Sequence, residues 1–175
     1  MIKAEDLRIG DLVRVNCDCA FPEGSVCIVT QINPERTYKE KKGVVTLSYV
    51  DGTDDGPWGV WCSNIEGIPL TPEILEKNGW LFSPRLSSAY AREDNRLEVH
   101  FYPQSEWMHV IFGSETLHKI RYVHELQHIL WSLGLDAQMT YPSLPILDIE
   151  AFQAQVEELD DELSNRILED LNENK

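Results

Sequence analysis

Hydrophobic and polar residues alternate along four short runs in the first third of the chain. The alternation is clearest at residues 26–31 and 44–49. A period of two residues is typical of strands that are covered on at least one face. The runs predict a small SH3-like antiparallel β-barrel over residues 1–67, with a curled sheet of similar size as the alternative and the polar stretch 33–42 as a connection. They cover residues 11–16, 25–32, 43–50 and 58–63.

The next part of the chain mixes helix and strand signals. Thr71 is suited to cap a short helix, with Pro72 at its first position and Asn78-Gly79 at its end. Two further β-type runs predict a hairpin, at residues 97–102 and 107–112. We expect residues 68–147 to form the α+β part of the same globule.

A longer helix is predicted from about residue 119 to residue 133. At about 100° per residue its apolar positions fall in one stripe. His124 and His128 lie nearly opposite that stripe, beside Trp131. The stripe consists of Tyr122, Val123, Leu126, Ile129, Leu130 and Leu133.

Residues 148–175 predict a long, acidic, amphipathic helix. This segment has ten acidic residues and two basic ones, and Asp160 is the misfit on its apolar stripe. At about 1.5 Å per residue, residues 149–171 would span roughly 35 Å, about the width of a domain of this size. We therefore expect this helix to meet a protein partner or a second copy of the chain. Its stripe consists of residues 149, 152, 156, 159, 163, 167 and 171.

The composition limits the classes of partner. Thirty acidic residues against fifteen basic ones give a net charge of −15, which repels a phosphate backbone and argues against nucleic-acid binding. No apolar run approaches the ~20 residues of a membrane span, and the start lacks the pattern of a signal peptide. We expect a cytoplasmic protein that does not contact membranes.

The string His124-Glu125-Leu126-Gln127-His128 matches the H-E-x-x-H pattern of zinc hydrolases. In that pattern two histidines one helical turn apart bind zinc, and the glutamate polarises a water molecule. A third ligand is not evident, because the extended pattern would need Gly and His at positions that hold Trp131 and Gly134. We expect a histidine pair at the surface or at an interface, with metal binding at His124 and His128 as an alternative and no required cofactor.

Two sets of side chains suggest a site for an anionic small molecule. Trp58 and Trp61 lie three residues apart, so in a strand one would be core. The other would be partly buried, or would be a stacking surface or a protein contact. Basic residues in a loop are usually just solvated, and that is the first interpretation here. The alternative is a pocket for an anion, because guanidinium groups can hold a phosphate even on a negatively charged protein. The candidate cations are Arg85, Arg92 and Arg96, with a further basic group, Arg36, Lys39, Lys41 and Lys42, in the predicted connection.

Three strings resemble a family of small uncharacterised proteins from gut-bacterial genomes, their phages and mobile elements. They are Leu7-Arg8-Ile9-Gly10-Asp11-Leu12-Val13, Ile68-Pro69-Leu70-Thr71-Pro72-Glu73-Ile74-Leu75 with Gly79-Trp80, and Tyr122-Val123-His124 with Leu126-Gln127. The resemblance implies a β-barrel start and a mobile-element origin, but no activity. Similar proteins usually read V-H-Q-L-Q-N at the third string, so Glu125 and His128 depart from the pattern.

Three functions are compatible with these features. The first is a non-enzymatic binding protein of phage or mobile-element type that blocks a host protein, as a homo-oligomer or with a partner. The second is a counter-defence protein that sequesters a nucleotide signal or another anionic small molecule. The third is a zinc-dependent hydrolase. The binding protein is our leading hypothesis, because the sequence contains no assembled catalytic set.

Overall fold

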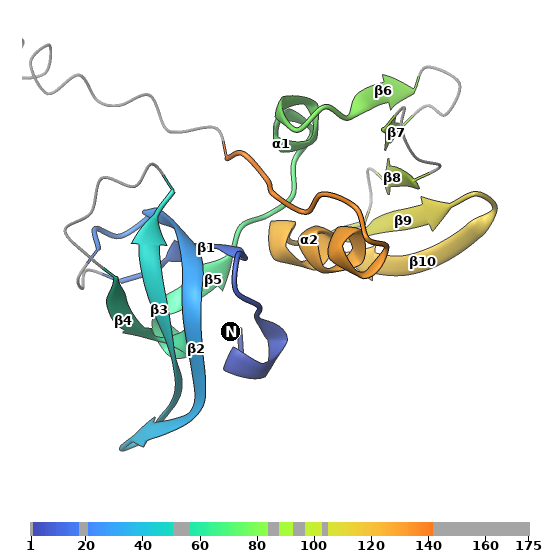
Figure 1. The fold of residues 1–175 in the computed structure, drawn as a ribbon. Coiled ribbons are helices and arrows are strands. Elements are labelled where there is room, and N and C mark those ends of the chain that lie inside the picture. The colour runs from blue at the N-terminus through green and yellow to red at the C-terminus, as the bar shows by residue number, and fades with distance from the viewer. Residues whose placement is uncertain are drawn as a thin grey trace, which may run out of the picture. The chain divides into compact units, whose positions relative to one another are not determined.

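A computed structural model describes residues 2–17, 21–50, 57–83, 88–92, 97–102 and 105–141. All of them belong to one unit, Met1–Tyr141. The described residues form two five-stranded antiparallel sheets, two α-helices and two short 3-10 helices (Figure 1). The expected mixture of helix and strand is present, with strand predominating. The helix expected at residues 149–171 lies outside the described residues and stays a prediction.

The first sheet has the strand order β4-β3-β2-β1-β5. Its strands are β1 (Leu12–Val15), β2 (Val26–Tyr38), β3 (Lys41–Tyr49), β4 (Trp58–Trp61) and β5 (Ile65–Gly67). β1 to β4 form a meander, and β5 pairs with the free side of β1 after a 3-10 helix, η2 (Cys62–Asn64). Among the described strands, β4 and β5 are the sheet edges and do not pair with each other. The sheet is open, so the expectation of a closed barrel was wrong.

Alternating apolar residues explain the inner face of this sheet. Val13, Val29 and Leu47 are fully buried and belong to one core with the 3-10 helix η1 (Ala4–Asp6). The expected connection at residues 33–42 is largely strand, because β2 and β3 continue as a hairpin as far as the Tyr38–Lys41 pair. The side chains of this extension are mostly exposed, so the sequence shows no apolar alternation there.

The second sheet is also a meander, with the order β10-β9-β8-β7-β6. Its strands are β6 (Leu81–Ser83), β7 (Ala89–Ala91), β8 (Leu97–Phe101), β9 (Met108–Phe112) and β10 (Glu115–Ile120). The hairpin predicted from residues 97–102 and 107–112 is confirmed as β8 and β9, with His100 opposite His109. β10 ends at Ile120, so the helix expected from about residue 119 begins later.

Two helices accompany this sheet. In α1 (Pro72–Lys77) the Thr71 side chain accepts a hydrogen bond of 3.4 Å from the Ile74 amide, which confirms the predicted cap. α2 (Val123–Ser132) buries Leu126 and Leu130 against the sheet, as its stripe predicted. Among the described helices, none combines the length and the apolar character that crossing a membrane requires.

The three strings of the family resemblance lie next to one another in the fold. The Leu70 amide donates to the Arg121 carbonyl at 2.9 Å, and the Val123 amide donates to the Ile68 carbonyl at 2.9 Å. Leu12, from the first string, is buried in the same core as α2 and the second sheet. The start of α2 therefore meets residues from both earlier strings.

Candidate functional site

The turn before β1 is joined to α2 by a buried carboxylate. Asp11 is 2% exposed, and its carboxylate oxygens lie 2.8 and 3.0 Å from Nε2 of His128. The same carboxylate accepts a hydrogen bond of 2.7 Å from the Arg8 amide. Gly10 in this turn has φ +97°, a conformation that glycine adopts without strain. Asp11 thus shapes the turn and holds the second histidine of the H-E-L-Q-H string.

Gln127 makes a second connection between the same two segments. Its side-chain oxygen accepts from the Leu12 amide at 3.0 Å, and its side-chain nitrogen donates to the Gly10 carbonyl at 3.0 Å and the Ala137 carbonyl at 3.2 Å. One carboxamide therefore satisfies three backbone groups. Buried backbone groups need such partners, since leaving one unpaired costs about 1–3 kcal/mol.

Glu125 acts as a cap of α2. Its Oε2 atom accepts hydrogen bonds from the backbone amides of Arg121, at 2.6 Å, and Tyr122, at 2.9 Å. These amides precede the first turn of the helix, where no backbone carbonyl is available to them. A glutamate that polarises water in a zinc hydrolase needs this carboxylate for the reaction. Here it stabilises the start of the helix.

His124 is buried beside the ring of Tyr122. The histidine is 4% exposed, and the two rings stack at 5.7 Å with an angle of 10°. Its Nδ1 atom is buried without a hydrogen-bond partner among the described residues. Burial lowers the pKa of His124, and the nearby carboxylates of Asp11 and Glu125 offset this only in part. The imidazole is therefore neutral at neutral pH.

The expectation of a surface histidine pair was wrong for His124. The apolar stripe does face the second sheet, but the opposite side of α2 contacts the turn that carries Gly10 and Asp11. The rings of His124 and His128 are 5.9 Å apart. Within the described residues, no three His, Cys, Asp or Glu side chains are placed to hold a metal ion.

Two hollows lie on either side of this junction. One, of about 760 Å³, is lined by His124, Tyr122 and His118. The other, of about 960 Å³, is lined mainly by apolar side chains, and we call it the Trp131 groove. Arg8 and His128 line both hollows. The apolar residues of the Trp131 groove are Ile9, Leu12, Ile28, Val50, Trp131, Leu135, Ala137 and Met139.

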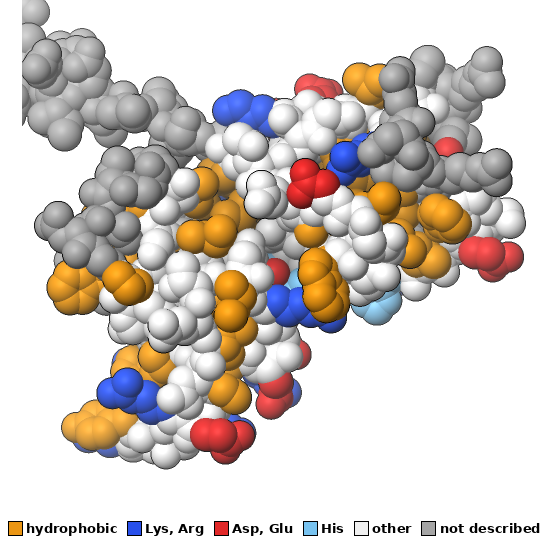
Figure 2. Space-filling view, in the orientation of Figure 1, with side chains coloured by type: hydrophobic (Ala, Val, Ile, Leu, Met, Phe, Trp, Pro, Cys, Tyr) orange, Lys and Arg blue, Asp and Glu red, His pale blue; other side chains and the backbone are white. Residues whose placement is uncertain are grey.

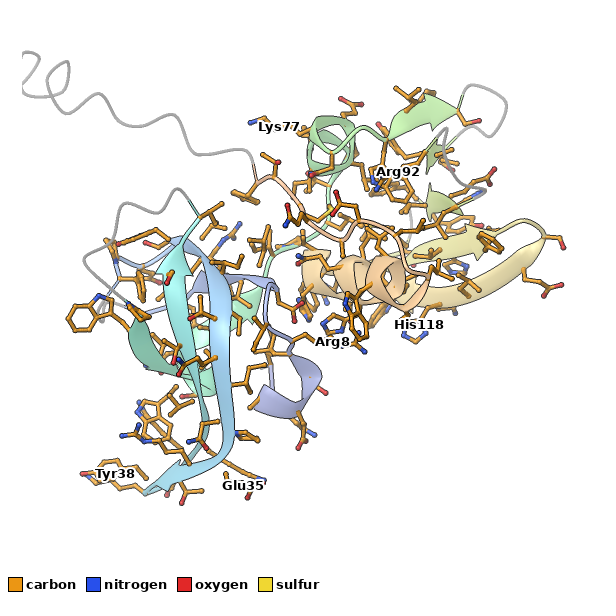
Figure 3. All side chains as sticks on the ribbon, in the orientation of Figure 1. Arg8, Glu35, Tyr38, Lys77, Arg92 and His118 are labelled. Carbon is orange, nitrogen blue, oxygen red and sulfur yellow. The ribbon has the colours of Figure 1, made fainter. Side chains whose placement is uncertain are left out.

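The Trp131 groove has an exposed aromatic ring and a cation at its edge. Trp131 is 66% exposed, and the guanidinium carbon of Arg8 lies 4.6 Å from the centre of its ring. Figure 3 labels Arg8 beside α2, and Figure 2 shows a basic and a hydrophobic side chain in contact at this place. Among the described residues, no carboxylate lies within ion-pair distance of the Arg8 guanidinium.

The described residues predicted for an anionic ligand, Trp58, Trp61 and Arg92, belong to different sheets. Trp58 and Trp61 lie in β4 of the first sheet, whereas Arg92 follows β7 of the second sheet and donates to the Asp136 carbonyl at 3.4 Å. Arg85 and Arg96 lie outside the described residues. Neither tryptophan is core, because Trp58 is half exposed and Trp61 is partly exposed. Instead, Trp61 stacks with Tyr38 at 6.5 Å.

Sequence reasoning missed that Asp11 and Gln127 join the turn before β1 to α2. The signal was weak, since Gly10-Asp11 resembles an ordinary turn and Gln127 stands within a string that suggests zinc chemistry.

Comparison of the chain with known protein families, with curated proteins and with solved structures finds no match.

Proposed function

We propose that this chain is a non-enzymatic binding protein that holds an apolar segment of a partner protein in the Trp131 groove. The observation that carries this proposal is the exposure of apolar side chains around the groove. Ile9 is 72% exposed, Trp131 66% and Val50 45%. Clustered exposed apolar side chains mark interaction sites more often than scattered ones do. A tryptophan among them is the residue type most enriched at the energetic centre of interfaces.

Arg8 adds a charge preference to the groove. Its guanidinium lies over Trp131, and no carboxylate of the described residues neutralises it. A guanidinium next to an apolar surface binds a carboxylate with two parallel hydrogen bonds. The occupant that fits is a segment with apolar side chains and an acidic residue beside them.

The framework of the groove is held in place before any partner arrives. Asp11 fixes the turn that carries Arg8 and Ile9, and Gln127 fixes the same turn to α2. A preorganised surface loses less conformational entropy on binding than a mobile one. His128 serves this framework through Asp11, and Glu125 caps the start of α2. These structural roles favour binding over zinc-dependent hydrolysis. If the protein comes from a mobile element, the partner is a host protein.

Selection from a random peptide library against the full chain tests this proposal. We expect enriched peptides to share apolar anchors with a neighbouring Asp or Glu. Trp131→Ala should weaken their binding about 30-fold or more, as loss of a central tryptophan does. Arg8→Gln should remove the preference for the acidic residue while apolar peptides still bind.

Trp58→Ala provides the matched control, because Trp58 is a half-exposed tryptophan on β4, outside the groove lining. It should leave peptide binding unchanged. A library that yields no enriched peptide, or peptides that bind wild type and Trp131→Ala equally, would disprove the proposal.

A further inference from the structure

The end of the β2–β3 hairpin concentrates positive charge on an acidic protein. Arg36, Lys39, Lys41 and Lys42 lie within seven consecutive positions, with Glu40 as the acidic residue among them. None of these four cations pairs with a carboxylate of the described residues. Figure 2 shows basic and hydrophobic side chains together at this end, where Figure 3 labels Tyr38.

An aromatic pair stands next to these cations. Tyr38 is 61% exposed and stacks with Trp61 at 6.5 Å and an angle of 28°. The ammonium nitrogen of Lys39 lies 5.4 Å from the centre of the Tyr38 ring. A ring supported by a second ring keeps a fixed orientation while much of its surface stays open. Such a ring can stack with a planar ligand, and base–aromatic stacking tolerates any base.

A cavity of about 530 Å³ lies at the same end of the β2–β3 hairpin. Lys41, Lys42 and Ser63 line it together with Lys3, whose ammonium group is already paired with Glu5 at 3.5 Å. Glu40 is the other acidic residue of its lining. The volume of the cavity falls within the range of small-molecule sites.

The cavity and the aromatic pair belong to the same corner of the first sheet. Lys41 is the cross-strand partner of Tyr38, and Cys62-Ser63 directly follow Trp61 in the chain. Consecutive strand residues point to opposite faces, so a ligand with its ring on Tyr38 meets Lys41, the cross-strand partner, most directly. Lys42 can reach the charged group of the ligand through the cavity that both lysines line.

We propose that this corner binds a nucleotide, with its base stacked on Tyr38 and its phosphate groups held by Lys41 and Lys42. A small nucleotide is favoured over a nucleic-acid strand because the net charge of −15 repels a long polyanion. The site is separate from the Trp131 groove, so its test does not depend on the peptide-binding proposal.

Titration of the full chain with ATP, inorganic phosphate and a short single-stranded DNA oligonucleotide tests the proposal, with tryptophan fluorescence as the readout. ATP should bind more tightly than phosphate. Tyr38→Leu should weaken ATP binding about tenfold or more, because base stacking is lost, and leave phosphate binding unchanged. The double variant Lys41→Gln/Lys42→Gln should weaken both ligands about tenfold or more, and its ATP affinity should depend less on salt.

Lys77→Gln is the matched control, since Lys77 is an exposed lysine on α1, and it should bind ATP like the wild type. All the substituted side chains are exposed, so each variant should keep the fold. Thermal unfolding of each variant checks this. Three results would overturn the proposal. They are no ATP binding at millimolar concentration, unchanged ATP affinity in the double variant, and tighter binding of the oligonucleotide than of ATP.

Discussion

The carboxylate of Asp11 and Nε2 of His128 lie 2.8 Å apart although 117 positions separate them in the chain. Asp11 is almost fully buried, and the His128 side chain is about one quarter exposed. This contact connects the turn before β1 to the helix that packs on the second sheet. It also orients the turn with Arg8 and Ile9, on which the proposed groove depends.

Replacing Asp11 should destabilise the fold strongly. Asp11→Ala removes the partner of His128 and the acceptor for the Arg8 amide. We expect a loss of about 2–4 kcal/mol in the free energy of unfolding, measured by urea denaturation. Glu115→Gln, at an exposed position of β10, serves as control and should change stability by less than about 0.5 kcal/mol. Equal stabilities of the two variants would contradict the structural role of Asp11.

Gln127 should matter through its three backbone contacts. Gln127→Ala leaves the Leu12 amide and the Gly10 and Ala137 carbonyls without this partner. The expected loss is about 2–3 kcal/mol, since water can reach only some of these groups. The exposed Gln138 is the matched position, and Gln138→Ala should be close to neutral. Hydrogen exchange at the Leu12 amide gives a local readout, and unchanged protection there in Gln127→Ala would refute the contact.

Gly67 is packed against the ring of Tyr122. A Cβ atom at this position would lie 2.6 Å from Cγ of the ring, which is close to the backbone and cannot swing away. Gly67→Ala should therefore cost about 1–3 kcal/mol. At Gly59 the nearest atom to an added Cβ is Cγ1 of Val44 at 3.5 Å, an ordinary contact. The melting temperature of Gly67→Ala should be well below that of Gly59→Ala in thermal unfolding. The reverse order would show that β5 and the start of α2 are not in contact.

The burial of His124 predicts a loss of stability in acid. Because its pKa is lowered in the fold, the unfolded chain binds more protons once the pH falls below about 6.5. The stability that the neutral imidazole contributes is complete above that pH and is lost as the pH falls through the lower folded-state pKa.

Urea denaturation at a series of pH values checks this expectation. His124→Leu should lose less stability than the wild type between about pH 7 and about pH 5, by up to about 1.4 kcal/mol per pH unit. His118→Gln, at an exposed histidine, should follow the wild-type curve. Parallel curves for the wild type and His124→Leu would show that His124 does not titrate differently in the fold.

Locally encoded features could be predicted from the sequence. Thr71 and Pro72 start α1 through contacts within a few residues, and the stripe of α2 follows from its apolar spacing. The β8–β9 hairpin could also be predicted, because buried residues such as Val99 and Val110 alternate with partly exposed ones.

Features that depend on distant contacts could not be predicted. The side of α2 that bears His124 has polar residues, and only the fold shows that His124 is buried there and that the turn at Asp11 contacts this side. β10 was missed because five of its six residues are exposed and leave no apolar alternation. The stacking of Tyr38 on Trp61 likewise requires the hairpin extension, which a polar sequence does not reveal.

The placement of Leu12 has a consequence for the order of folding during synthesis. This side chain belongs to β1 but is buried among residues of α1, α2 and the second sheet. When residues 1–67 have left the ribosome, Leu12 lacks its neighbours and Asp11 lacks His128. The amino-terminal sheet thus completes its packing only after α2 emerges. A fragment that ends at Gly67 would expose Leu12 and the apolar surface around it to chaperones and proteases.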